Sequence, residues 1–215
     1  MDSSTQPPVT PAYPVQFSVD YPDRDLNRLT TAFRIIVAIP IFVVAATVSG
    51  HEWGWYGPNR EVVAATGGAL FLAPLLMIVF RQKYPRWWYD WNLELARFTN
   101  RVGVYVALMD DHYPSTDERQ SVTLELPYPD VQRDLNRWLP LVKWFLAIPH
   151  YIVLAFLVLG ALVSIVIAWF AILFTGRYPR GLFDYVVGVG RWGNRVNAYA
   201  FLLVTDQYPP FSLSP

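Results

Sequence analysis

Cysteine is absent from the chain, and charged residues are scarce. Without cysteine, the protein can form no disulfide, no thiolate metal site and no cysteine nucleophile. Charged residues make up only 16% of the sequence, and the 17 acidic residues balance the 17 Lys and Arg residues. A chain without net charge has no general basic field to attract a polyanion. We therefore expect no nucleic-acid partner.

Motifs for catalysis and cofactor binding are also missing. The sequence contains no Walker loop, no dinucleotide-binding glycine pattern, no G-x-S-x-G and no H-E-x-x-H. We predict no cofactor and no catalytic or metal-binding residue, so enzymatic activity is uncertain and disfavoured. Two groups of polar residues could be considered as metal ligands, but neither has regular ligand spacing. They are His51, Glu52 and Glu61, and His112 with Asp110 and Asp111. Turn formation explains the two aspartates better.

Apolar and aromatic residues are abundant instead. Hydrophobic residues make up 53% of the chain, with nine Trp and thirteen Tyr. This composition is too apolar for an ordinary soluble domain and predicts a membrane protein. Residues 1–14 lack the basic and apolar regions of a signal peptide, so we expect a disordered leader and insertion through an internal segment.

Four apolar segments are predicted to cross the membrane. The stretch 144–174 has no charge and would measure roughly 46 Å as one helix, too long for one upright span of a hydrocarbon core of about 30 Å. A turn at Gly160 would divide it into two arms of about 27 Å each. The predicted spans are 29–49 and 62–80 in the first half, and 139–157 and 161–178 in the second.

Basic residues flank every predicted span. A single helix through 144–174 would place its basic flanks on opposite sides, whereas a hairpin places every cluster in the cytoplasm, as the positive-inside rule favours. We predict a multi-pass protein of a bacterial inner (plasma) membrane with both termini cytoplasmic, and one long helix remains the alternative. The clusters are Arg24, Arg28 and Arg34; Arg81, Lys83 and Arg86; Arg133, Arg137 and Lys143; and Arg177 and Arg180.

The pentapeptide RDLNR occurs twice in the chain. Self-similarity of this kind predicts two tandem copies of one unit, residues 15–114 and 115–215. Because each unit has two predicted spans, the copies should be parallel in the membrane. The aligned stretches are 24–40 with 133–149, which places Arg34 over Lys143 and Pro40 over Pro149, and 80–108 with 174–202.

Each unit also contains an amphipathic helix. In 85–101, Asp90, Glu94, Arg97 and Arg101 share one helical face, opposite an apolar face rich in Trp. We predict an interfacial helix whose Trp residues lie at headgroup level. The corresponding segment, 180–195, keeps this pattern, although three glycines weaken the helix. The predicted interfacial aromatic residues are Trp87, Trp88, Trp91 and Trp192.

Short strands complete each unit. Alternating apolar and polar residues predict strands at 15–21 and 121–128, and apolar residues predict two more at 102–109 and 196–204. The fold class is therefore a mainly α-helical membrane protein with two tandem parallel repeats. Each repeat has a transmembrane helical hairpin, an interfacial amphipathic helix and short β-strands that form a small cytoplasmic sheet.

Several motifs resemble those of a known family. The combination of YPD…RDLNR…IP, YPR, NRV…Y…L and the ending YPPFSL is similar to the bacterial membrane family catalogued as domain of unknown function 4389, found in one or two copies. The resemblance extends over nearly the whole chain. It implies an integral membrane protein and no particular activity.

The repeated basic residues are the leading candidates for a site. Paired Arg residues could bind an anionic lipid headgroup, but anchoring of the helix end at the membrane surface is the simpler interpretation. His150 could relay protons, yet its counterpart is Ile41, which favours a neutral His bonded to a backbone carbonyl. The candidate headgroup or anchoring residues are Arg24, Arg28, Arg34, Arg86, Arg133, Arg137, Lys143 and Arg180.

Three functions are compatible with these patterns. We favour a non-enzymatic scaffold or accessory subunit of a membrane complex, with the lipid bilayer, anionic lipid, a membrane protein or a second copy as partner. A small oligomeric transporter or channel is the first alternative. A membrane enzyme acting on lipid headgroups is the second, with Asp23, Asp25, Asp130 and Asp134 as its surface carboxylates, but it lacks a matched acid, base and metal set.

Overall fold

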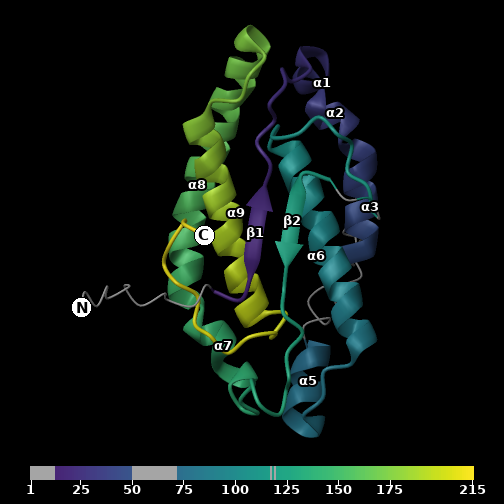
Figure 1. Ribbon diagram of the computed structural model, residues 1–215, viewed down its shortest axis with the longest axis vertical. Helices are drawn as coiled ribbons and strands as arrows, with labels where there is room; N and C mark the ends of the chain where they lie inside the picture. Colours follow the sequence, from purple (N-terminus) through teal and green to yellow (C-terminus); the bar gives the residue numbers. More distant parts are fainter. Residues whose placement is uncertain (1–12, 50–71, 117, 119) are drawn as a thin grey trace, which may run out of the picture.

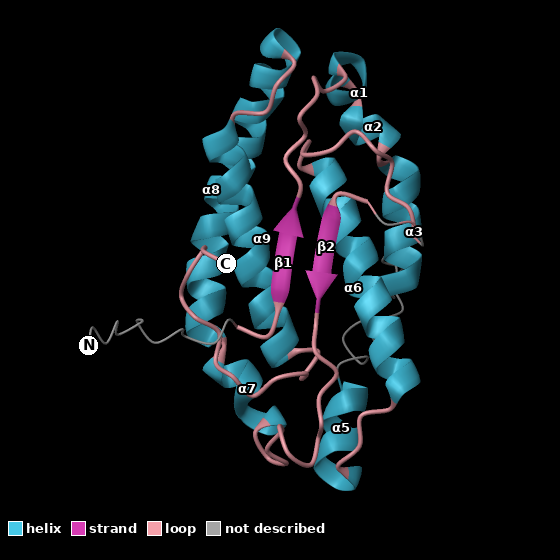
Figure 2. Ribbon diagram, in the orientation of Figure 1, coloured by secondary structure: helices cyan, strands magenta, loops and turns pink. Residues whose placement is uncertain are grey.

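A computed structural model describes residues 13–49, 72–116, 118 and 120–215 (Figure 1). Most of the expected leader, much of the predicted span 62–80 and the outer-loop residues His51, Glu52 and Glu61 lie outside these residues. The described chain is mainly helical, with a small two-stranded sheet (Figure 2), which confirms the coarse fold class. The elements are β1 (Gln16–Val19), α1 (Arg28–Ala32), α2 (Arg34–Val37), α3 (Ile39–Ser49), α5 (Leu72–Arg81), α6 (Arg86–Val106), β2 (Val122–Glu125), α7 (Pro140–Leu146), α8 (Ile148–Thr175) and α9 (Arg180–Ala200).

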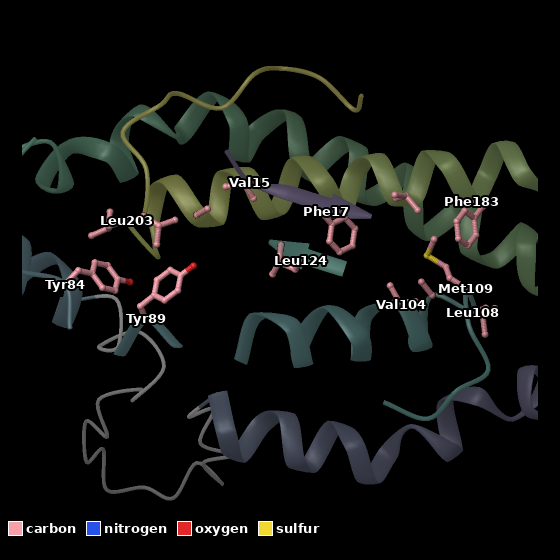
Figure 3. Close-up of a cluster of buried hydrophobic side chains, with 14 of the residues drawn as sticks. Val15, Phe17, Tyr84, Tyr89, Val104, Leu108, Met109, Leu124, Phe183 and Leu203 are labelled. Atoms are coloured by element: carbon pink, nitrogen blue, oxygen red, sulfur yellow. The ribbon is translucent and has the colours of Figure 1, made fainter. Parts of the chain in front are cut away.

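The two strands lie within the segments where alternation predicts strands. They pair antiparallel, from Gln16 opposite Glu125 to Val19 opposite Val122. Because side chains alternate along a strand, Phe17 and Leu124 point into the core while Ser18, Thr123 and Glu125 are exposed. Figure 3 shows Phe17 and Leu124 among the buried side chains between the helices. The sheet thus has one apolar and one largely polar face.

The elements lie side by side in one flat molecule. Figure 1, viewed down the shortest axis, shows α8, α9, the two strands, α6 and α3 in that order. Each neighbouring pair in this row is in contact. The central core lies between the strands and the helices α6 and α9 (Figure 3). Two smaller clusters join α3 to α6 through Ala38, Ile41, Phe98, Val102 and Tyr105, and α7–α8 to α9 through Ala147, Trp192, Val196, Tyr199 and Ala200.

The predicted hairpin in the second half is wrong. α8 runs unbroken for 28 residues through Gly160, and the short helix α7 precedes it, so the two spans 139–157 and 161–178 do not form. A turn here would leave backbone N–H and C=O groups without partners, because residues 157–163 around Gly160 have no polar side chain to satisfy them. A glycine inside a helix costs only about 1 kcal/mol. By length and composition, α8 is the described helix that could cross a membrane.

The first apolar segment is divided at the position where the second is also divided, between α7 and α8 at Ala147, and it has one further break. The predicted span 29–49 consists of α1, α2 and α3, with short breaks at Phe33 and Ala38. Proline lacks a backbone N–H and favours the first turn of a helix. Pro40 and its aligned residue Pro149 are each the second residue of a new helix, α3 and α8.

The strands predicted at 102–109 and 196–204 are also wrong. α6 continues to Val106 and α9 continues to Ala200. In α6, Val102 and Tyr105 follow Phe98 at helical spacing and are buried with it against α3, so packing favours helix here over the strand propensity of valine and tyrosine. The glycines expected to weaken this helix, Gly188, Gly190 and Gly193, do not interrupt α9.

The two aligned halves run in opposite directions. β1 and β2 are antiparallel, and Figure 1 shows α6 and α9 running in opposite directions. The predicted parallel arrangement of the copies in the membrane stays a prediction. It depended on two spans in each unit, and the continuous α8 removes that premise.

Gly160 permits close packing of α9 on α8. A Cβ atom at this position would lie 2.6 Å from the hydroxyl of Tyr185, which donates to the carbonyl of Leu157 at 2.9 Å. We predict that Gly160→Ala lowers the thermal unfolding temperature of the detergent-solubilised protein. Gly193→Ala in α9 meets open space and should stabilise by about 0.5–1 kcal/mol. Equal stabilisation by both substitutions would contradict this packing.

Candidate functional site

Arg34 is a buried cation held by the residues that follow α6. Only 2% of Arg34 is exposed. Its Nη2 lies 2.6 Å from Asp111 Oδ1, and its Nη1 donates to the carbonyl of Asp110 at 3.1 Å. The guanidinium also lies 4.1 Å from the centre of the Tyr105 ring, a favourable cation–π arrangement. Arg34 therefore ties α2 to the end of α6.

Lys143 occupies the same position in the other half. It is fully buried, its Nζ lies 2.7 Å from Asp206 Oδ1, and it donates to the carbonyl of Thr205 at 2.7 Å. The ammonium lies 5.1 Å from the centre of the Tyr199 ring. Lys143 therefore ties α7 to the end of α9, as Arg34 ties α2 to α6.

The asparagine of each RDLNR motif shares the same aspartate. The backbone N–H of Asn27 donates to Asp111 Oδ2 at 2.6 Å, and that of Asn136 donates to Asp206 Oδ2 at 2.5 Å. Each asparagine side chain also accepts from the backbone N–H two residues later, at 2.9 Å. The repeated motif thus forms a chain corner fixed by an aspartate far away in the sequence.

Sequence reasoning missed these aspartates as partners of Arg34 and Lys143. The signal was present, because an Asp precedes a Tyr-Pro pair by two residues in each half, at Asp111 and Asp206. From the sequence alone, turn chemistry is the interpretation of Asp111. The role of both aspartates as partners depends on a contact between residues 62 or more positions apart, which no local pattern encodes.

Burial and ion pairing act in opposite directions on Lys143. Burial lowers the pKa of Lys143, because a buried ammonium loses hydration, while the hydrogen bond and charge of Asp206 raise it. The net direction is downward from the ordinary value of 10.5. Asp206 thus opposes loss of the proton from this buried side chain.

The remaining candidate arginines are more exposed, and those other than Arg28 contact separate partners. Arg24 lies 3.5 Å from Asp110, and Arg133 lies 3.7 Å from Asp130. Arg137 Nε instead donates to the carbonyl of Val79 at 2.6 Å. Arg86 and Arg180 lie over the rings of Tyr128 and Tyr21, at 4.8 and 4.7 Å. Headgroup binding by these residues stays a prediction.

The predicted interfacial tryptophans divide into two groups. Trp87 is 68% exposed and Trp91 is 38% exposed at the start of α6, and Trp88 packs partly against the core. Trp192 is buried, so its placement at the interface is wrong. Its Nε1 donates to Nδ1 of His150 at 3.0 Å, because α9 turns this side chain toward α8.

His150 is part of an aromatic cluster. It is fully buried, stacks on Phe211 with ring centres 4.0 Å apart, and lies near Tyr208. Nδ1 of His150 accepts the hydrogen bond from Trp192. Nδ1 is therefore not the atom that donates to a backbone carbonyl, as the sequence-based prediction required of one ring nitrogen. Nε2 has no partner in the described part of the chain. This environment ties the chain end to α8.

An open cavity of about 620 Å³ lies beside Asp110 and is lined by Arg24, His112 and Ser121 among others. Burial acts to raise the pKa of Asp110. Hydrogen bonds from His112 and from Ser121 Oγ, the latter at 2.7 Å, outweigh this effect, so the net result is a lowered pKa. Asp110 lies between Ser121 and His112, so the histidine cannot activate the serine as a base.

Within residues 13–49, 72–116, 118 and 120–215, no three His, Asp or Glu side chains are grouped to hold a metal ion.

The two buried pairs should respond differently to pH. Asp111→Asn and Asp206→Asn each leave a buried cation uncompensated, which should cost about 3–5 kcal/mol. Because the pKa of Lys143 is lowered in the folded state, the unfolded state binds more protons as pH approaches 10.5. The free energy of unfolding of Asp206→Asn should therefore rise with pH in this range. Arginine keeps its proton, so Asp111→Asn should gain no such recovery. Urea unfolding from about pH 7 to pH 10 measures both.

The exposed pair of Arg133 and Asp130 supplies the control, and Asp130→Asn should change the free energy of unfolding by less than about 1 kcal/mol. Identical pH dependence of Asp111→Asn and Asp206→Asn would contradict the proposed origin of the difference.

Comparison with known proteins identifies one related stretch. The family described as Domain of unknown function (DUF4389) matches residues 138–212. This stretch includes α7, α8 and α9 together with both members of the Lys143–Asp206 pair. No curated protein and no solved structure matches the chain. Residues 138–212 are therefore similar to one copy of this family. The match includes no second copy, and it does not identify the source organism as a bacterium.

Proposed function

We propose that the chain is a non-enzymatic scaffold or accessory subunit embedded in a membrane. The observation that carries this proposal is the apolar surface of α8. Large apolar side chains are exposed along the whole helix, including Ile152, Phe156, Leu159, Val163, Val166 and Phe170. Burying each such side chain is worth roughly 1.5–3 kcal/mol. A lipid bilayer is the apolar environment that supplies this burial.

The first half supports the same environment. Along α1, α2 and α3, Ile35 is 79% exposed and Ile36 is 63% exposed, while Thr31 and Arg34 face the protein. Thr31 and Arg34 are buried and lie three residues apart, about one helical turn. Pro140 and Lys143, the aligned residues of the second half, are buried with the same spacing. Both apolar segments thus present a wide apolar surface and turn their few polar residues inward.

Polar residues in α8 are bound within the protein, which favours a scaffold over a channel. His150 is enclosed by aromatic rings, and Ser164 Oγ donates to the carbonyl of Gly160 at 2.9 Å. Neither lies on the exposed face of α8. A conducting path through an oligomer of this chain would need polar side chains on that face.

Pairing of the surface carboxylates favours a scaffold over a lipid enzyme. Asp25 forms an ion pair with Arg177 at 2.9 Å, and Asp130 forms one with Arg133. The Asp134 carboxylate accepts the backbone N–H of Asp130 at 3.1 Å. These contacts give Asp25, Asp130 and Asp134 structural roles. They do not assemble an acid, a base and a substrate position together.

We also propose that the chain consists of two copies of one unit. Corresponding residues make corresponding contacts in both halves, as Arg34 and Lys143 do. Arg97 and Arg191 each donate to a strand carbonyl, of Leu124 and of Phe17, at 3.1 Å. Where the halves meet, the side chains of Asn100 and Asn194 donate to each other at 2.9 and 2.8 Å. This reciprocal contact is what a two-fold relation between the halves would produce.

Charge placed on the apolar surface should weaken membrane association. The double variant Leu159→Arg, Val166→Arg adds two charges to the lipid-facing surface, which cost at most roughly 5–7 kcal/mol, the value for the bilayer centre, so the protein should leave the membrane fraction. Thr123→Arg with Asp184→Arg adds charge to exposed polar positions and should leave the chain in the membrane. Fractionation by ultracentrifugation measures both. An unchanged distribution of the first variant would contradict lipid contact.

Copurification from native membranes in mild detergent tests the scaffold role. Mass spectrometry should find a stoichiometric protein partner with the wild-type chain. Turnover of a bound lipid would instead support the enzyme, and ion flux by a reconstituted homo-oligomer would support the channel.

A further inference from the structure

We infer that the protein inserts into one leaflet with α8 parallel to the membrane plane. The inference rests on the proposed membrane location and specifies how the bilayer is contacted. It differs from a transmembrane α8 in one physical respect, which is the depth at which the charged residues beside α8 would lie.

The charged residues of α6 and α9 gather on one side of the molecule. In α6, Asp90, Glu94, Arg97 and Arg101 share one helical face. Arg97 donates to a strand carbonyl, and Arg101 Nη1 donates to the carbonyl of Ser115 at 3.0 Å. The charged face is therefore the face that the strands and the connecting loop cover.

The same relation holds in α9. Arg191 donates to the carbonyls of Phe17 and Leu213, and Arg195 Nη2 donates to the carbonyl of Ser214 at 2.8 Å. The strand β1 and the C-terminal segment thus lie over the charged face of α9. Both helices present their charges toward the polar side of the molecule, where Ser18, Thr123 and Glu125 are exposed. We call this side the polar face.

The reverse side of α6 and α9 carries no charge. Half a helical turn away from the arginines, α6 presents Leu95, Thr99, Gly103 and Val106. At the aligned positions, α9 has Gly193 and Asn197, which are half-buried, and Val189 and Ala200, which are buried. The apolar helices α3 and α8 flank these two stripes at the edges of the flat molecule (Figure 1). We call this side the apolar face.

An upright α8 would carry the polar face into the hydrocarbon. α9 follows α8 closely, since Trp192 reaches His150 near the start of α8 and Tyr185 reaches Leu157 about two turns later. The exposed Glu94 and Glu125 belong to elements in the same row. Each charge at the bilayer centre costs about 2.5–3.5 kcal/mol, and sheets with open edges do not occur in contact with lipid tails.

A helix in the membrane plane avoids these costs. One leaflet contributes about 15 Å of hydrocarbon, half of a core of about 30 Å, and a helix with side chains is about 10–12 Å across. α8 is apolar on every side except the strip that packs on α9, so it can be immersed along its whole length. The polar face then stays in water, and the basic residues at both ends of α8, among them Arg137 and Arg180, reach the headgroups of one leaflet.

Single cysteines placed at both ends of α8 test this arrangement, and the absence of native cysteine makes the labelling specific. Gln132→Cys lies before α7, Gly181→Cys lies after α8, and Glu125→Cys lies on the polar face; all three positions are exposed. Each variant is treated with a membrane-impermeant maleimide in right-side-out and in inverted vesicles. A permeant maleimide confirms that each cysteine is reactive.

In-plane insertion predicts that all three variants react in the same vesicle type and are protected in the other. Reaction of Gln132→Cys and Gly181→Cys in opposite vesicle types, with Glu125→Cys protected in both, would overturn it. Failure of the membrane proposal has a different result, because the chain would then appear in the soluble fraction and all three variants would react without vesicle lysis.

Discussion

A buried cation bound to an aspartate secures each apolar segment of this protein to an amphipathic helix. In the proposed membrane location, apolar contacts alone would give little specificity, because lipid tails offer the same environment as leucine or valine. A charged hydrogen bond in a buried site is strong and directional. The Arg34–Asp111 and Lys143–Asp206 pairs therefore determine where α2 and α7 dock on the ends of α6 and α9. The small apolar clusters beside each pair, around Ile41 and around Trp192, complete the same two joints.

These joints allow the molecule to have two different faces. The arginines of α6 and α9 donate to backbone carbonyls of the strands, the loop after α6 and the C-terminal segment, so these guanidinium groups form their hydrogen bonds on the polar face. The apolar helices lie at the edges of the same flat molecule. A protein of this shape can place a wide apolar surface in lipid while it offers a polar surface to a partner. Two halves related by a two-fold axis through the flat faces would both insert from the same side.

The parts of the fold that follow from local patterns could be predicted from the sequence. Alternation located the short strands around Phe17 and Leu124, helical periodicity located the amphipathic helices, and the repeated RDLNR pointed to the two equivalent corners. Local patterns could not decide between a hairpin and a continuous α8, because Gly160 is compatible with both. In the structure α8 is continuous, and a distant residue, Tyr185, packs against this glycine. The aspartate partners were hidden for the same reason, since their role depends on contacts across the fold.

The depth of α8 in the bilayer tests the central claim most directly. Spin labels at Ile152, Leu159 and Val166, which share the exposed face of the helix, can be compared by their relaxation with oxygen and with a water-soluble nickel complex in liposomes. The account predicts similar depths at all three positions. A label at Leu159 near the bilayer centre, with the labels at Ile152 and Val166 closer to opposite surfaces, would show that α8 crosses the membrane and would contradict it.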